Sequence, residues 1–244
     1  MNDTPASETC RTEALPEKGE SLSMKYRNAI PASFVERKNR FVATVELNGH
    51  RETVHVKNTG RCREILLPGA TVFLTEPGTA GRKYKYDLIA ARKENGLLIN
   101  LDSQAPNRVA AEWLALQPFT RILPEYRWGR SRLDFYMEEG TDRYLMEVKG
   151  CTLERHGIGY FPDAPTERGV RHIRELIAAR EAGFRAFLAF VIQMDGIREV
   201  RTEKEIHPEF AIAVQEACGA GVEILFFCCH VEPDALTIKE ILRR

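Results

Sequence analysis

The feature that most constrains this chain is a change in the spacing of its apolar residues near residue 105. Before that point, apolar and polar residues alternate in short runs separated by turn residues, which is typical of half-buried β-strands. After it, segments with helical spacing are interleaved with continuous apolar runs, which indicate helices between buried strands. We therefore expect two domains, residues 24–100 and residues 101–244, within a mixed α/β protein.

The first domain is expected to be all-β. Asn48-Gly49 lies between two alternating runs, which favours a tight hairpin. Several short strands within about 75 residues predict an OB-like β-barrel, although a small β-sandwich would have the same composition. Residues 1–23 are polar and are predicted to be a disordered tail. The expected strands cover residues 40–47, 51–58, 70–77, 82–92 and 97–102.

The second domain is expected to place helices against a mixed sheet. A helix is predicted near residues 106–116, and two β-like runs follow, SRLDFYM (131–137) and YLMEVKG (144–150). Helices are predicted again before Gly183 and over residues 207–221, each followed by a continuous apolar strand. The two strands cover residues 187–194 and 222–231.

Composition narrows the class of protein. A hydrophobic content of 43% argues against general disorder, and no apolar run reaches the roughly 20 residues of a membrane span. The first 20 residues lack the pattern of a secretory signal, so a cytoplasmic location is expected. The six cysteines form no C-x-x-C pair, and Cys228, Cys229 and His230 fall in an apolar run that predicts a buried strand rather than a metal site.

Charge is unevenly distributed along the chain. The whole chain has 35 basic and 35 acidic residues, yet residues 24–100 carry 14 Lys or Arg against 7 Asp or Glu. A basic block confined to one domain indicates a surface for a polyanion such as nucleic acid. A solvated surface with a chance imbalance is the alternative.

Three charged residues lie inside the two β-like runs of the second domain. Glu147 and Lys149 are two residues apart and therefore share a face of their strand, and Asp134 lies on the neighbouring strand of the expected hairpin. Charges in apolar strands are costly unless they are paired or bind a metal. The hypothesis is a Mg²⁺ or Mn²⁺ site made by both carboxylates and the carbonyl of Val148, with Lys149 beside it. A simple cross-strand salt bridge is the alternative.

Several segments, taken in their order along the chain, resemble the sugar fermentation stimulation protein family. The most specific of them is FPDAPTERGVRHIREL (161–176). The resemblance implies an OB-like domain and a domain with the fold of PD-(D/E)XK nucleases, DNA binding with little sequence preference, and a role in sugar, notably maltose, metabolism. It assigns Asp134, Glu147 and Lys149 to the nuclease pattern and the helix acid of that pattern to Glu112, with Glu125 as the alternative. The other segments are VKNTGRCREILLPG (56–69), RKYKYDLIAA (82–91), QAPN (104–107), SRLDF (131–135) and MEVKGCTL (146–153).

Further residues are candidates for contacts with DNA, possibly single-stranded, or with RNA. They combine positive charge, turn backbone and aromatic rings, the groups that bind phosphates and stack on bases. The alternatives are a helix cap for the 163–172 segment and a half-buried face for the tyrosines. The candidates are Asn58, Arg61, Arg82, Lys83, Tyr84, Lys85, Arg130, Arg132, Arg168 and His172.

Three functions fit these observations. The first is a metal-dependent nuclease, the second is a non-catalytic DNA-binding regulator, and the third is a protein-interaction module with a basic surface. An intact Asp134, Glu147 and Lys149 set favours the first over the second. The basic block disfavours the third.

Overall fold

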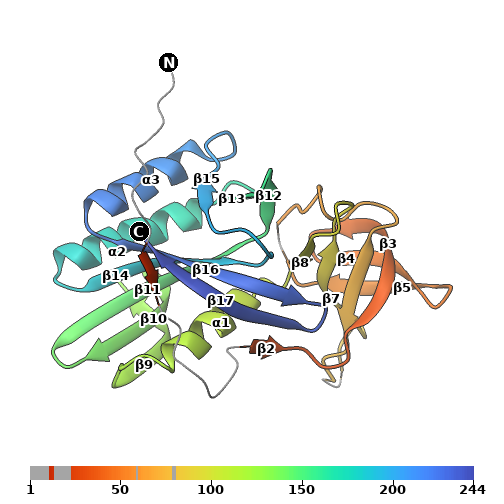
Figure 1. The fold of residues 1–244 in the computed structure, drawn as a ribbon, viewed down its shortest axis with the longest axis horizontal. Coiled ribbons are helices and arrows are strands. Elements are labelled where there is room, and N and C mark those ends of the chain that lie inside the picture. The colour runs from red at the N-terminus through yellow and green to blue at the C-terminus, as the bar shows by residue number, and fades with distance from the viewer. Residues whose placement is uncertain (1–10, 14–22, 59, 79–80) are drawn as a thin grey trace.

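The computed structural model describes residues 11–13, 23–58, 60–78 and 81–244, and it forms two parts that lie end to end (Figure 1). A six-stranded sheet makes one part and an eight-stranded sheet makes the other, with a separate three-stranded sheet beside them. The mixed α/β class predicted from the sequence is confirmed.

The first part is a closed barrel. Its sheet has the order β5-β4-β3-β6-β7-β8, and a parallel pairing between β5 and β7 closes five of the strands into a ring. Val45, Val54, Leu74 and Leu88 are fully buried inside it. The barrel prediction is confirmed and the open sandwich is excluded. The strands are β3 (Ile30–Asn39), β4 (Val42–Leu47), β5 (His50–Val56), β6 (Thr71–Thr75), β7 (Asp87–Arg92) and β8 (Leu98–Asn100).

The second part is built on the eight-stranded sheet. Its order is β1-β17-β16-β14-β11-β10-β9, with β2 also paired to β17, and its central strands β11, β14 and β16 are parallel. These central strands are buried on both faces, which explains their continuous apolar sequences. The strands are β1 (Arg11–Glu13), β2 (Ser23–Lys25), β9 (Arg121–Trp128), β10 (Ser131–Glu139), β11 (Asp142–Cys151), β14 (Arg185–Ile192), β16 (Glu223–Glu232) and β17 (Ala235–Arg243).

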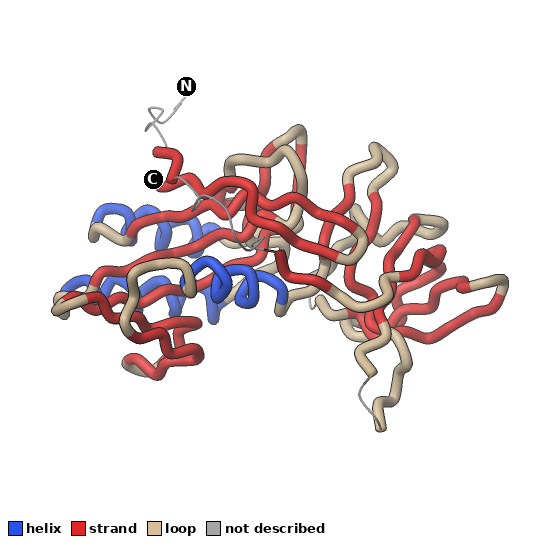
Figure 2. The backbone as a smooth tube through the Cα atoms, turned by 60° about the horizontal axis from the view of Figure 1, so that its bottom comes forward, coloured by secondary structure: helices blue, strands red, loops and turns tan. Residues whose placement is uncertain are grey.

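Three helices cover this sheet. Helix α1 (Ala105–Leu114) packs on one face, whereas α2 (Glu167–Glu181) and α3 (Pro208–Gly219) pack on each other and on the opposite side. Within the described residues the barrel contains no helix (Figure 2). None of these helices combines the length and apolar character needed to cross a membrane. The small sheet consists of β12 (Leu153–Arg155), β13 (Ile158–Phe161) and β15 (Val200–Thr202).

The N-terminal segment differs from the predicted tail where it is described. Residues 11–13 form strand β1 along β17, and Met24 of β2 is buried against the second sheet. An edge strand supplies backbone hydrogen bonds to any extended segment, so even a polar sequence can pair there. The remainder of the predicted tail, residues 1–10 and 14–22, lies outside the described residues.

A buried polar network joins the two parts. The Gln193 side-chain amide donates to the backbone carbonyls of Asn100 and Asp102, at 3.0 Å and 3.1 Å, and to the Asn100 side chain. The Asp102 carboxylate accepts hydrogen bonds from Lys57 and Tyr26. Because these groups are paired with each other away from water, they fix the end of the barrel and the start of α1 against β14.

Candidate active site

The site lies where strands β10 and β11 separate. The two strands pair from Glu139 and Asp142 as far as Phe135 and Met146, and Asp134 and Glu147 come next along each strand. Beyond that point, the Val148 N–H donates to Asp134 Oδ2 at 2.7 Å rather than to a backbone carbonyl. The end of the strand pairing therefore brings one carboxylate from each strand to the same place.

Glu147 is the buried centre of this arrangement, with only 3% of its surface exposed. Lys149 and His172 both donate to its Oε1 atom, and the His172 Nδ1 atom lies 2.5 Å from it. Its second oxygen, Oε2, is buried and has no hydrogen-bond partner among the described residues. Glu147 and Lys149 thus share a face of β11, as their spacing predicts, and one carboxylate oxygen is left available for a ligand.

The two carboxylates differ in their affinity for a proton. Burial opposes ionisation of Glu147, but Lys149 and His172 outweigh it and hold its pKa below the ordinary value. The pKa of Asp134 is raised to about 6, first by burial and second by the negative charge of Glu147, against the opposing effects of the Val148 N–H, Lys149 and Asn107. The negative charge of Glu147 thus disfavours ionisation of Asp134, and a cation between the two carboxylates would relieve this repulsion.

Asn107 is a residue that the sequence analysis did not single out individually. It lies in the first turn of α1, and its side-chain amide donates to Asp134 Oδ1 at 2.7 Å. Together with the Val148 N–H, it fixes both oxygens of the Asp134 carboxylate. The only signal in the sequence was its position in the QAPN segment, because an Asn near a helix start is otherwise explained by capping.

Helix α2 supplies the opposite wall of the site. Thr166 caps this helix by accepting the Gly169 N–H at 3.0 Å, which confirms the capping alternative for this residue. Arg168 Nε donates to His172 Nε2 at 3.2 Å, so the imidazole accepts on that side and donates from Nδ1 to Glu147. His172 is 2% exposed and both ring nitrogens are engaged. In this structure it positions Glu147, and its predicted contact with a phosphate remains a prediction.

The two candidates for a further acid differ in their position and in their neighbours. Glu112 follows Asn107 by five residues, which places it about 140° away around α1. Burial raises the pKa of Glu112, and the neighbouring charge is Arg108 of the same helix. Glu125 is about half exposed and forms an ion pair with Arg132 at 2.6 Å. Within the described residues neither acid has a hydrogen bond or ion pair with Asp134 or Glu147.

The prediction of a basic and aromatic strand over residues 82–86 is wrong. These residues form a loop before β7, and Arg82 donates to Asp87 rather than sharing a strand face with the tyrosines. Lys83 and Lys85 each lie over the ring of the following tyrosine. The physical reason is that Gly81 adopts a positive φ and the Asp87 carboxylate holds the loop, so extended pairing begins only at Asp87.

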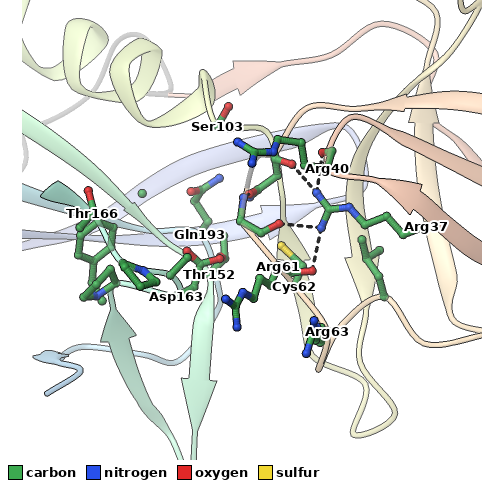
Figure 3. Close-up of a pocket in the computed structure, with 18 of the residues that line it drawn as sticks. Arg37, Arg40, Arg61, Cys62, Arg63, Ser103, Thr152, Asp163, Thr166 and Gln193 are labelled. Carbon is green, nitrogen blue, oxygen red and sulfur yellow. Dashed lines mark hydrogen bonds between the residues drawn. The ribbon is translucent and has the colours of Figure 1, made fainter. Parts of the chain in front are cut away.

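The other predicted binding residues fall into two places. Arg130 and Arg132 lie at and after the β9–β10 turn, where Arg130 donates its backbone N–H to Glu175 at 3.0 Å. Asn58 and Arg61 line a cleft of about 820 Å³ between the barrel and the second domain (Figure 3). That cleft is bounded on its other side by Gly150, which directly follows Lys149.

The donor atoms limit which metal ions fit the site. The described residues contain no group of three or more His, Cys, Asp or Glu side chains that would hold an ion unaided. The site offers two carboxylates, and the buried Glu147 Oε2 has no partner among the described residues. The carbonyl of Val148, whose N–H donates to Asp134, stays a predicted ligand. A set of oxygen ligands that is completed by water suits Mg²⁺, which uses one or two carboxylates and keeps several waters.

Comparison with known proteins places both parts of the chain in one family. Residues 35–101 match the SfsA N-terminal OB domain, and residues 104–235 match the sugar fermentation stimulation protein RE domain. The chain is 49% identical over 216 residues to the sugar fermentation stimulation protein homolog of Desulfitobacterium hafniense strain Y51, covering 87% of this chain and 94% of that protein. It is 44% identical over 221 residues to the homolog of Clostridium beijerinckii, covering 89% and 97% of the two chains.

A solved structure has the same architecture. The structure of Pyrococcus furiosus SfsA in complex with Ca²⁺ superimposes with a TM-score of 0.81 at 29% sequence identity. The superposition covers 91% of this chain and 98% of that chain. The arrangement of the OB barrel and the α/β domain is therefore shared with that protein.

The raised pKa of Asp134 leads to a direct test. In a carbon-detected NMR titration without divalent cations, we expect the Asp134 carboxyl to titrate near pH 6, well above the ordinary value of 3.8. Replacing the neighbouring charge in Glu147→Gln should lower that midpoint, because one of the two main causes of the rise is removed. An Asp134 midpoint near 4 in the unmodified protein would show that the carboxylates do not interact as described.

Proposed function

The chain belongs to the sugar fermentation stimulation protein family, and we propose that it is a nucleic-acid-binding phosphodiesterase that depends on Mg²⁺ or Mn²⁺. The observation that carries the proposal is the convergence of Asp134, Glu147 and Lys149 where β10 and β11 separate, with one buried Glu147 oxygen that has no partner in the described part of the chain. In a purely structural ion pair, both oxygens of a buried carboxylate would be expected to have partners.

A hard divalent cation suits this site in two respects. The available ligands, the carboxylates of Asp134 and Glu147 and the carbonyl of Val148, are all oxygens. The Pyrococcus furiosus relative was solved in complex with Ca²⁺, which is itself an oxygen-binding cation. Both points support an ion between the two acids.

Each residue has a definite task in the proposed reaction. A bound Mg²⁺ would polarise a phosphodiester oxygen and lower the pKa of a coordinated water. Asn107 and the Val148 N–H orient Asp134, while His172 holds Glu147 in its ionised form. Lys149, which donates to Glu147, is placed to donate a hydrogen bond to the negative charge that develops on the phosphate.

The positive charge of the rest of the molecule favours nucleic acid as the phosphodiester substrate. The barrel domain carries an excess of basic residues, 14 against 7 acidic residues over residues 24–100. Arg168 is exposed at the start of α2 and adjoins the site through His172, so its free guanidinium nitrogens can reach a phosphate. DNA is the proposed partner, with RNA as the alternative substrate in the same assay.

Cleavage assays with matched variants test the proposal. We expect labelled DNA or RNA to be cut only with Mg²⁺ or Mn²⁺, and Asp134→Ala and Lys149→Ala to reduce the rate by about 100-fold or more, as losses of charge-stabilising groups usually do. Lys239→Ala and Asp234→Ala, both on exposed residues away from the site, should retain full activity. Glu112→Ala and Glu125→Ala determine whether either acid takes part.

The same assay can also contradict the proposed nuclease activity. If no single- or double-stranded DNA or RNA is cut with either ion, the chain is a non-catalytic DNA-binding regulator of sugar metabolism, the second candidate for this family. If cutting survives both Asp134→Ala and Lys149→Ala, the reaction occurs elsewhere. Circular dichroism of each variant verifies that the fold is retained.

A second prediction concerns His172 as a positioning residue. His172→Leu removes the donor to Glu147 Oε1, and we expect the affinity for Mn²⁺, measured by isothermal titration calorimetry, to fall about 10- to 100-fold, the usual cost of losing such a supporting contact. His172→Gln, which retains an N–H donor, should recover part of that loss. His50→Leu, on an exposed residue of β5, is the control. Equal Mn²⁺ affinity in His172→Leu and the unmodified protein would refute this role.

A further inference from the structure

A cleft separates the barrel from the α/β domain and has a volume of about 820 Å³ (Figure 3). Its barrel wall consists of the β3–β4 turn and the loop after β5. Its other wall consists of the end of β11 with Thr152 and the segment 161–166 that leads into α2. The cleft is polar on both sides, and arginine is the commonest charged residue in it. Four arginines line it, Arg37, Arg40, Arg61 and Arg63.

Arg37 organises the loop that forms the barrel wall. Its guanidinium donates to the backbone carbonyls of Arg40, Asn58, Gly60 and Arg61, over distances of 2.6 to 2.8 Å. All four acceptors are neutral, and within the described residues Arg37 forms no ion pair. Its positive charge therefore holds the loop in place and still contributes to the potential of the cleft.

The other three arginines extend into solvent. Arg40, Arg61 and Arg63 are exposed, and none of them forms an ion pair with a carboxylate in the described part of the chain. Some surface arginines at other positions do pair with a carboxylate, as Arg132 does with Glu125 and Arg201 with Glu199. Unpaired arginines gathered at one cleft are typical of a surface that binds phosphates.

The two walls of the cleft also approach each other at Gly60 and Asp163. Asp163 is the only acid among the described residues that line the cleft, and the positive charges of Arg37 and Arg61 favour the ionised form of its carboxylate. A Cβ atom on Gly60 would lie 1.9 Å from Asp163 Oδ2, so any other residue here would force the Asp163 side chain to move. The cleft lining contains four arginines and one acid, whose negative charge is partly offset by Arg37 and Arg61. The cleft is therefore strongly positive.

We propose that this cleft binds a single-stranded segment of nucleic acid through its phosphates. Its volume lies within the range of about 300–1,000 Å³ for pockets that enclose small ligands, so the cleft can enclose a few nucleotides but not a duplex. Arginines on the barrel wall contact successive phosphates, in the manner of the positively charged grooves of OB folds. Asn58 and Thr152 provide neutral hydrogen-bonding groups for the bases or sugars.

The position of the cleft connects it to the candidate active site. Gly150, on its wall, directly follows Lys149, and Thr166, also on its wall, caps the helix that carries Arg168 and His172. A single strand of nucleic acid bound in the cleft would therefore extend toward Glu147. Binding to the cleft stands by itself, and only the delivery of a strand to Glu147 rests on the proposed function.

Fluorescence anisotropy tests the binding directly. The probe is a labelled 12-nucleotide single strand, with the 12-base-pair duplex of the same sequence for comparison, both in EDTA so that cleavage plays no part. We expect the single strand to bind at least about tenfold more tightly than the duplex, and Arg61→Ala and Arg63→Ala each to weaken it roughly tenfold, the usual cost of one charged hydrogen bond. Arg51→Ala, on an exposed barrel arginine outside the cleft, should bind like the unmodified protein.

Salt dependence provides a second measurement on the same samples. Loss of one phosphate contact should reduce the slope of log affinity against log salt by about 0.7 for a single strand. Equal losses in Arg51→Ala and Arg61→Ala, an unchanged slope, or a duplex that binds as tightly as the single strand would overturn the proposal. Weaker binding in Arg61→Ala without any cleavage by the unmodified protein in Mg²⁺ would refute the nuclease and support the cleft.

Discussion

The structure depends on the cost of burying the Glu147 carboxylate within an apolar sheet. A buried carboxylate remains ionised only when charged and hydrogen-bonding partners offset its lost hydration. Lys149 provides the charge from the same face of β11, and His172 provides a hydrogen bond from α2. The two-residue spacing of the acid and the lysine, and the packing of α2 over β11, are therefore parts of one arrangement. The uncompensated Oε2 atom is the part of this arrangement that remains open to a ligand.

The two domains are joined so that the barrel faces this site. Gln193 at the end of β14 bonds to the backbone that connects the barrel with α1, and Asn107 near the start of that helix bonds to Asp134. On the other side, Asp163 contacts the barrel loop at Gly60, just before α2 begins. The same short segments thus hold the domains together and position the carboxylates.

Local patterns predicted the site better than they predicted its surroundings. Two-residue periodicity was sufficient to place Glu147 and Lys149 on one face, because a strand has only two faces. The barrel and the mixed sheet followed from turn residues and apolar spacing. Asn107 and the pairing of His172 with Glu147 could not be predicted, because they depend on how helices pack on a sheet. Strand β1 was missed since its pairing with β17 uses the backbone alone. Residues 82–86 were misassigned because alternating lysines and tyrosines fit a loop equally well.

The central claim is that Asp134 and Glu147 share one divalent cation. The most direct measurement is anomalous diffraction from crystals soaked in Mn²⁺, with the data collected near the manganese absorption edge. We expect an anomalous peak between the two carboxylates, about 2 Å from oxygen atoms of both and near the Val148 carbonyl. A peak bound to other residues, or none at this site while Lys149 stays paired with Glu147, would show that these charges form a salt bridge and not a metal centre.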